Sequence, residues 1–306
     1  GTDSFTYTVS DQSGAANDTD TAIVTITINA TNVAPVAQDD AIAADEDNTA
    51  TGSVLADNGS GADSDANSDA LTVTQVNGDV ALVGAPITLA GGGVLTVQSN
   101  GDFTFDPSNQ YETLAVGETA TETFTYTIQD GNGGSDTATG TITVGGVNDS
   151  PTAVNDLVPT DEDTAVSGNV LTNDSDVDGS DTLTVLEVGG STLAVGVATT
   201  TAGGGTVTIN GDGSFLYDPG SAFNDLRVGF SGTDSIQYTV SDGNGGSSVA
   251  NLVFDIAGVN DAPTAEDDAF SVGEDNVVSG DVTIDNGGGV DSDPDTGDFP
   301  FIGEVN

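Results

Sequence analysis

The chain is 306 residues long and carries 50 acidic residues against a single basic one, Arg227, so its formal net charge is −49. This charge excludes binding to nucleic acid or to an anionic membrane through clustered Lys and Arg. Histidine and cysteine are absent, which excludes disulfides, Ser–His and Cys–His nucleophile pairs, and zinc sites with the usual ligands.

Alternating apolar and polar residues predict short β-strands along the chain, and no long amphipathic segment indicates a helix. In chain order, the predicted strands are 5–9, 23–28, 71–76, 94–97, 103–105, 124–128, 141–144, 206–209, 214–217 and 236–240. Two predicted hairpins turn at 100–102 and at 210–213, where Asn-Gly stands between strands. About seven short strands per repeat, with turn signals between them, are typical of a β-sandwich.

Two motifs recur along the chain at a nearly fixed spacing. The motif Asn-x-x-Pro begins at Asn32, Asn148 and Asn260, which lie 116 and then 112 residues apart. An aromatic strand that ends in aspartate keeps the same period at 5–11, 124–130 and 236–242. Self-similarity at a fixed period indicates one folding unit copied in tandem.

Domain boundaries are predicted at the Asn-x-x-Pro motifs, because proline ends strands and stiffens connections. The predicted domains are the C-terminal strands of a preceding repeat at 1–31, complete repeats at 32–147 and 148–259, and the N-terminal part of a following repeat at 260–306. Each complete repeat is long enough for its own core. Since the sequence begins inside a repeat, we expect it to be part of a longer polypeptide.

The acidic residues need neutralising cations. Two carboxylates about 4 Å apart repel each other by about 1 kcal/mol even in bulk water, and basic side chains are almost absent. Bound cations and very high ambient salt are the two solutions. A halophilic surface predicts acids scattered over strand faces, whereas these acids gather at joints and turns, where alternate aspartates can converge on one calcium ion.

The repeated motifs resemble known bacterial repeats over essentially the whole chain. The first complete repeat resembles a VCBS-type repeat in residues 100–107, 114–126, 130–134 and 147–151. The second, through 161–163 and 173–178, is similar to bacterial cadherin-like tandem repeats. This resemblance implies an all-β fold of tandem Ig/cadherin-like β-sandwich domains in an extended array. It also implies a large surface protein or RTX-type adhesin, secreted to the cell surface of a Gram-negative bacterium.

The resemblance further implies calcium at the joints between successive sandwiches. At the joint between the complete repeats, the matching ligands are Glu46, Glu122, Asn148, Asp149, Asp174, Asp176 and Asp242. At the following joint they are Glu162, Asp234, Asn260, Asp261, Asp291 and Asp293. At the first joint they are Asp3, Asn32, Asp63, Asp65 and Asp130.

The first joint departs from this pattern because Val33 stands where the other linkers carry Asp149 and Asp261. We therefore expect this joint to bind calcium weakly or to lack an ion. All three linkers also lack the leading aspartate of animal cadherins, and the matching residues are Ala30, Gly146 and Gly258.

Other interpretations of the acidic motifs are weaker. Residues 174–179 resemble the start of an EF-hand loop, but Val185 stands at its last position instead of glutamate, and no flanking helix is predicted. The glycine-rich segment 133–136 is not repeated in immediate tandem, as a calcium β-roll requires. A glycosidase acid pair is disfavoured because the acids occupy copied turns and not one singular cleft.

The sequence therefore predicts a non-enzymatic, calcium-stiffened spacer of a long bacterial surface protein or adhesin. One alternative is a polysaccharide-binding module. Such a module needs an exposed aromatic strip, whereas Tyr7, Tyr126 and Tyr238 occupy equivalent strand positions and are interpreted as structural residues. Another is a subunit of a surface filament, formed by lateral or head-to-tail self-association. The expected partners are neighbouring repeats of the same chain, with no nucleic acid and no membrane insertion.

Overall fold

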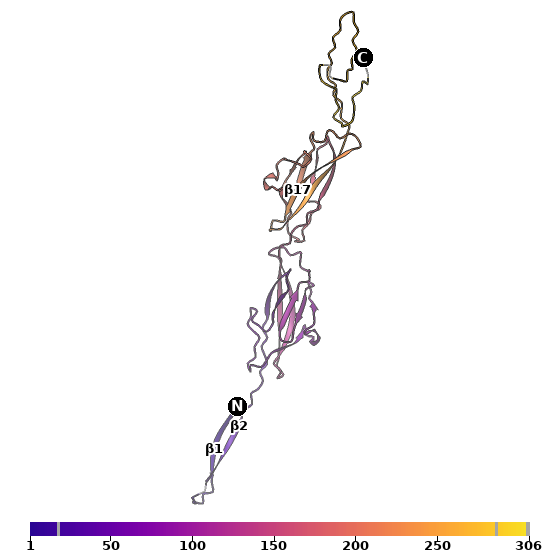
Figure 1. Ribbon diagram of the computed structural model, residues 1–306. Helices are drawn as coiled ribbons and strands as arrows, with labels where there is room; N and C mark the ends of the chain where they lie inside the picture. Colours follow the sequence, from indigo (N-terminus) through magenta and orange to yellow (C-terminus); the bar gives the residue numbers. More distant parts are fainter. Residues whose placement is uncertain (17–18, 285–286, 304–306) are drawn as a thin grey trace. The chain divides into compact units, whose positions relative to one another are not determined.

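The computed structural model describes residues 1–16, 19–284 and 287–303, and its strands are drawn in Figure 1. The chain divides into two compact units, Gly1–Tyr111 with Thr119–Gly145, and Glu112–Glu118 with Gly146–Asn306. Regular structure in the described residues is almost entirely β, with two single-turn 3₁₀ helices, η1 (Val80–Leu82) and η2 (Thr192–Ala194). The prediction of an all-β fold is confirmed. No helix among the described residues is long and apolar enough to cross a membrane.

The first unit opens with an antiparallel hairpin of β1 (Thr2–Ser10) and β2 (Thr19–Thr27). Apolar residues of this hairpin are exposed, including Phe5 and Tyr7. Both strands match the last two strands of each complete repeat in sequence.

The rest of the first unit is a sandwich of two four-stranded sheets. One sheet has the order β3 (Asp40–Asp45), β10 (Ser135–Gly145), β9 (Thr119–Gln129) and β5 (Thr72–Val76). The other has the order β4 (Ala50–Ser53), β8 (Asp102–Asp106), β7 (Val94–Val97) and β6 (Ile87–Thr88). The described repeat thus has eight strands where about seven were predicted, and the two-residue β6 is the shortest of them.

Alternation along the strands builds the core of this sandwich. On β9, Phe124, Tyr126 and Ile128 are buried while the residues between them are more exposed. This is the pattern of a strand with one face in the core and one in water. Large aromatic residues dominate the energetics of such a core because each buries a large apolar area.

The second unit repeats the same sandwich. One sheet has the order β11 (Asp156–Asp161), β18 (Ser247–Ala257), β17 (Ser231–Ser241) and β13 (Thr184–Val188). The other has the order β12 (Val166–Asn169), β16 (Ser214–Asp218), β15 (Thr206–Ile209) and β14 (Thr199–Thr200). In its core, Tyr217 stacks on Phe254 with ring centroids 3.6 Å apart. Both predicted hairpins are present, as β7–β8 and β15–β16.

Each repeat also contains one parallel strand pair, which places acidic residues at its exit end. β3 pairs in parallel with β10, and β11 pairs in parallel with β18. The residue after β3 is Glu46, whose amide donates to Gly145 O at 3.2 Å, and Glu162 donates likewise to Ala257 O at 3.1 Å. Glutamate is thereby held beside the point where the chain leaves each sandwich. The turn between the last two strands lies at the opposite end of the same sheet.

Candidate metal centres

The turn between β17 and β18 holds Asp242 in one orientation. Its Oδ1 accepts hydrogen bonds from the backbone amides of Asn244, Gly245 and Gly246 at 2.7, 3.0 and 3.1 Å. Its Oδ2 accepts from Asn148 Nδ2 at 3.0 Å. Burial alone would raise the pKa of Asp242, but the hydrogen bonds from Asn148 and the turn amides lower it overall. The carboxylate is therefore held ionised at the entry end of the repeat.

Asp176 and Asp181 meet Asp242 there, and we call these three residues the second turn cluster. One carboxylate oxygen from each lies within 4.8 Å of the others. Asp181 accepts from Asn244 Nδ2 through both oxygens at 2.9 Å. Asp176 Oδ2 and Asn148 Oδ1 are buried and accept no hydrogen bond from the described residues. Buried acceptors are normally paired, so a cation or a water molecule is expected at these two oxygens.

Asp65, Asp69 and Asp130 form the equivalent first turn cluster, with one oxygen from each again within 4.8 Å of the others. Asn32 Nδ2 donates to Asp130 Oδ2 at 2.7 Å, and Asn132 Nδ2 donates to Asp69 Oδ2 at 2.8 Å. The bond from Asn32 is the largest cause that lowers the pKa of Asp130. The Asn-x-x-Pro motif and the Asp-Gly-Asn-Gly-Gly turn therefore build the same arrangement twice.

A further acidic group, which we call the linker cluster, consists of Glu162, Asp261 and Asp295. Glu162 is fully buried, and its Oε1 accepts from the Val259 amide at 2.8 Å. The Asp261 amide donates to Asp295 Oδ2 at 3.2 Å. Glu162 Oε2, Asp261 Oδ2 and Asp295 Oδ1 are buried and accept no hydrogen bond from the part of the chain that is described. Burial, with a smaller contribution from the charges of Asp261 and Asp295, raises the pKa of Glu162.

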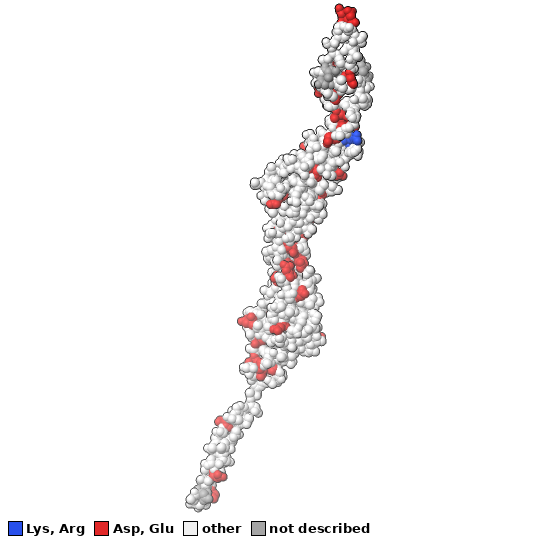
Figure 2. Space-filling view, in the orientation of Figure 1, with Lys and Arg blue, Asp and Glu red and all other residues white. Residues whose placement is uncertain are grey.

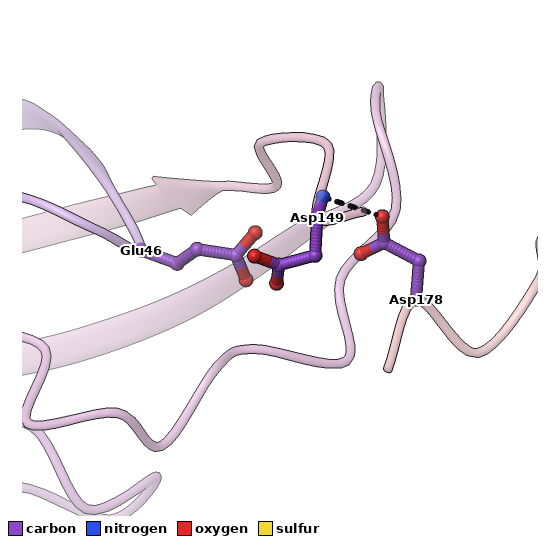
Figure 3. Close-up of side chains that lie close together, drawn as sticks. All are labelled: Glu46, Asp149 and Asp178. Atoms are coloured by element: carbon purple, nitrogen blue, oxygen red, sulfur yellow. Dashed lines mark hydrogen bonds between the residues drawn. The ribbon is translucent and has the colours of Figure 1, made fainter. Parts of the chain in front are cut away.

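The same backbone bond occurs at the start of the second repeat, where the Asp149 amide donates to Asp178 Oδ2 at 2.9 Å. Figure 3 shows this bond together with Glu46, the residue of the first repeat at the position of Glu162. Asp178 is only 2% exposed, and burial is the main cause that raises its pKa. At the start of the first repeat the bond runs from the Val33 amide to Asn67 Oδ1 at 2.8 Å. The first repeat thus keeps this hydrogen bond, but Val33 and Asn67 replace the two carboxylates that Asp149 and Asp178 provide in the second repeat.

Three of the predicted ligands point away from these clusters into their own repeat. These three are Asp63, Asp174 and Asp291. Their Oδ1 atoms accept hydrogen bonds from the backbone amides of Gln38, Val154 and Glu266, respectively. The alternate pair that reaches the clusters is therefore Asp176 with Asp178, two residues after the predicted pair. The cluster residues that sequence reasoning missed are Asp69, Asp178, Asp181, Asp295 and Asp298. In the sequence, the alternation of Asp174 and Asp176 continues to Asp178. This continuation is the sequence signal that could have identified Asp178.

Glu122 and Asp234 lie inside the sandwiches, apart from the clusters. Glu122 accepts from Tyr111 Oη at 2.7 Å, and Asp234 accepts from Tyr217 Oη at 2.8 Å. The third residue at this position, Asp3, is exposed on β1 and accepts from the Ser4 amide at 2.8 Å. Of the remaining predicted ligands, Asn260 donates to Asp261 O at 2.6 Å, and Asp293 lies within 4.8 Å of Asp295 and Asp298.

The acidic surface is patchy. Figure 2 shows acidic side chains gathered in separate groups on the visible face, with uncharged surface between them, and one basic patch. Arg227 accounts for all the basic charge of the side chains, and its guanidinium lies 4.5 Å from the centroid of the Phe230 ring. A general halophilic coat predicts acids on all strand faces, whereas on the visible face the acids are grouped.

Comparison with known proteins gives a consistent result. A family model described as a bacterial cadherin-like domain matches residues 32–146 and again 148–258. A calcium-binding lectin, RapA2, from Rhizobium johnstonii is 30% identical over 142 residues, which are 44% of this chain and 58% of that protein. The chain thus spans less than two thirds of that relative. These matches confirm the resemblance to bacterial cadherin-like repeats.

Solved structures of animal cadherins are also similar. Drosophila N-cadherin EC1-4 matches with 16% identity and a TM-score of 0.42, over 74% of this chain and 50% of that one. Mouse cadherin-23 EC22-24 matches with 16% identity and a TM-score of 0.41, over 85% of this chain and 74% of that one.

Proposed function

Because this chain belongs to the bacterial cadherin-like domain family, we propose that it is a calcium-stiffened, non-catalytic spacer in an extracellular bacterial adhesion protein. The observation that carries the proposal is the repeated turn cluster, in which three aspartates and the Asn-x-x-Pro asparagine converge at the entry end of each repeat. The rest of the proposal follows from what such a cluster binds and where it lies.

Calcium suits these clusters better than other common metals. It takes six to eight oxygen ligands from carboxylates, amide carbonyls and water, and the chain has no histidine or cysteine for softer metals. In the second turn cluster, Asp176 Oδ2 and Asn148 Oδ1 are buried acceptors that a cation would satisfy. The turn amides already hold Asp242 in place, so little ordering remains for the ion to impose.

We propose that the linker cluster is a second kind of calcium site. At the end of the second repeat its ligands are Glu162, Asp261 and Asp295. Asp149 and Asp178 are the equivalent carboxylates at the start of the second repeat. The proposed joint sites do not include six of the predicted ligands, because among the described residues none of the six belongs to a group of three or more acidic side chains that could hold a metal ion. These residues are Asp63, Asp174, Asp291, Asp3, Glu122 and Asp234. The loss of both carboxylates at Val33 and Asn67 supports weaker calcium binding at the first joint.

Both kinds of site include residues of the linker, so an ion bound there restricts the linker directly. This is the physical basis of the proposed stiffening. If a site has a dissociation constant about ten times below the ambient calcium concentration, its ion adds roughly 1.4 kcal/mol to the stability of the folded state. The bound charge also relieves repulsion among carboxylates that have almost no basic partners. An extracellular location fits, since extracellular calcium modules bind with dissociation constants of about 10⁻⁴–10⁻³ M.

Carbohydrate binding is the second candidate function, because the curated relative is named a calcium-binding lectin. A polar pocket at the start of the first repeat favours it, since its lining offers amides, a hydroxyl and a carboxylate to sugar hydroxyls. The pocket is lined by Ala30, Thr31, Asn32, Asn67, Asp69 and Asn132. A glycan array probed with the chain in calcium and in chelator tests this candidate. Reproducible calcium-dependent binding would contradict a purely passive spacer.

Isothermal titration of the 306-residue chain with calcium tests the main proposal. The double variant Asp130→Asn/Asp242→Asn should lose the ions of both turn clusters. Asp255→Asn is the matched control, because it removes one charge from an exposed position on β18 that lies in no cluster. Equal calcium stoichiometry and affinity in the wild type and the double variant would contradict the assignment.

A further inference from the structure

A buried tyrosine in each repeat is surrounded by more hydrogen-bond acceptors than it can serve. Tyr126 is fully buried, and its Oη lies 2.9 Å from Gln38 O, 3.0 Å from Val54 O and 3.2 Å from Asp63 Oδ2. A phenol carries one proton, so it makes one full donation. The other oxygens then receive no full donation from this hydroxyl, and an unpaired polar group is costly where it is buried.

Asp40 adds a second carboxylate to this group. It is 3% exposed, and its Oδ1 accepts from Asn58 Nδ2 at 2.7 Å. Its Oδ2 is buried and accepts no hydrogen bond from the described residues. Burial is the main cause that raises the pKa of Asp40, and the charge of Asp63 adds to it. Two carboxylates and two carbonyls therefore converge on one neutral hydroxyl, and we call this arrangement the tyrosine cage.

The second repeat reproduces the cage at the equivalent positions. Tyr238 Oη lies 2.9 Å from Asp156 Oδ2, 3.2 Å from Val154 O, 3.2 Å from Val170 O and 3.4 Å from Asp174 Oδ2. The composition is the same in both repeats, with two aspartates, two backbone carbonyls and one phenol. An arrangement built twice from distant segments is a feature of the fold and not an accident of one loop.

The chemistry of the cage selects a hard cation. Five oxygens, two of them from carboxylates, match the ligand types of calcium and would fill five of its six to eight coordination positions, with water in the rest. No basic side chain can substitute, because Arg227 is the only one in the chain. Burial is the main cause that raises the pKa of Tyr126 above its usual range, and the charges of Asp40 and Asp63 add to it, so the phenol keeps its proton and would bind as a neutral oxygen.

We propose that each complete repeat holds a calcium ion inside the sandwich, bound by the tyrosine cage and separate from the joint sites. In the first repeat the ligands are Asp40, Asp63, Tyr126 Oη and the carbonyl oxygens of Gln38 and Val54. In the second they are Asp156, Asp174, Tyr238 Oη and the carbonyl oxygens of Val154 and Val170. Asp63 and Asp65 then contribute to two different sites although they stand two residues apart, so one loop connects the cage to the turn cluster.

Calcium titration of the full chain with Asp40→Asn/Asp156→Asn tests the cage. The number of bound calcium ions should fall by two relative to the wild type, while Asp255→Asn leaves it unchanged. Terbium gives an independent readout, because the chain has no tryptophan and an ion in the cage would contact Tyr126 or Tyr238. Terbium emission excited through tyrosine should be lost in the cage variant and retained in Asp130→Asn/Asp242→Asn, which separates this inference from the joint sites.

A second variant keeps the test decisive if the asparagine variant does not fold. Tyr126→Phe/Tyr238→Phe retains both rings and all carboxylates but removes one ligand oxygen from each cage. Calcium affinity for two of the ions should fall by about 10-fold or more, the loss that follows when supporting groups of a metal site are removed. An unchanged number of bound calcium ions in the asparagine variant, or unchanged calcium affinities in the phenylalanine variant, would overturn the proposal. The two carboxylates of each cage would then be balanced by a shared proton instead of a calcium ion.

Discussion

Replacing Asp242 with asparagine separates the structural role of this carboxylate from its proposed role as a calcium ligand. In the absence of calcium, the new side chain can still accept from the turn amides through its oxygen. Its NH₂ group must then face Asn148 Nδ2, which now donates to Asp242 Oδ2 at 3.0 Å. Losing a hydrogen bond to a charged group in this buried position costs about 1–3 kcal/mol. The calcium-free variant should therefore be moderately less stable but folded.

In the presence of calcium the difference should grow. At a concentration about 100 times the dissociation constant, one ion stabilises the folded state by about 2.7 kcal/mol. For a domain of roughly 100 residues each kcal/mol shifts the melting temperature by about 4–8 °C, so the rise is roughly 10–20 °C for one ion. Asp242→Asn should forfeit most of this rise in the second repeat.

Differential scanning calorimetry of the full chain measures the effect with and without calcium. The first repeat, whose Asp130 is intact, serves as an internal reference, and Asp255→Asn controls for the change in net charge. The quantity of interest is the calcium-dependent rise of the second repeat's transition, which the structural cost of the substitution does not affect. A rise as large in Asp242→Asn as in the wild type would show that Asp242 is not a calcium ligand.

Four further predictions follow from named contacts. Gly246→Ala should weaken calcium binding at the second turn cluster, because its Cβ would clash with Asp242 Oδ2. Gly211→Ala, whose Cβ would have nothing within 4 Å, should leave calcium binding unchanged. Titration calorimetry compares the two variants, and equal calcium affinities would count against the cluster. In calcium-free buffer, stability should increase as the pH falls from neutral toward the pKa of unfolded carboxyls, because folded carboxyls with raised pKa values, such as Glu162 and Asp178, bind protons more tightly than they do unfolded. Below about pH 4 it should fall, because Asp130 and Asp242 have lowered pKa values and their contribution, present above the unfolded value, is lost; a steady decline from pH 7 in thermal melts would contradict this. Phe254→Ala should cost about 3–5 kcal/mol by leaving a cavity against Tyr217, and a loss below 1 kcal/mol in urea unfolding would show that this stack is not central to the core. Arg227→Ala should cost about 0.5–1 kcal/mol through its lost contact with Phe230, and a larger loss in the same assay would mean that this cation neutralises nearby acids.

The strands were predictable because their signal is local. Alternation at 124–128 follows directly from one face of β9 packing in the core, and the hairpins follow from Asn-Gly turns. The parallel pairing of β3 with β10 was not predictable, because it joins segments about 100 residues apart through backbone bonds that carry no residue signature. That pairing nevertheless determines where Glu46 lies.

The candidate site was predictable in kind and only partly in detail. Asn32, Asn148, Asp130 and Asp242 lie in turns whose geometry their own motifs dictate, and the structure brings them together as pairs. From the sequence, Asp174 was assigned to the joint, because spacing alone does not show which of the alternate aspartates faces the joint and which faces the interior of the repeat.

Whether such a carboxylate faces the joint or the interior of its repeat depends on hydrogen-bond donors that lie far away in the sequence. Val154 and Tyr238 take the oxygens of Asp174, and Tyr111 takes an oxygen of Glu122. Neither contact has a local signature, so sequence reasoning could not assign these carboxylates to the interior of the repeat.

Small-angle X-ray scattering of the full chain in calcium and in chelator tests the spacer function most directly. With calcium we expect a longer and narrower distribution of interatomic distances. After chelation we expect a broader ensemble of shorter conformations, while circular dichroism shows the sandwiches still folded. Superimposable scattering profiles in the two conditions, with calcium binding verified by titration, would contradict the claim that calcium stiffens the linkers.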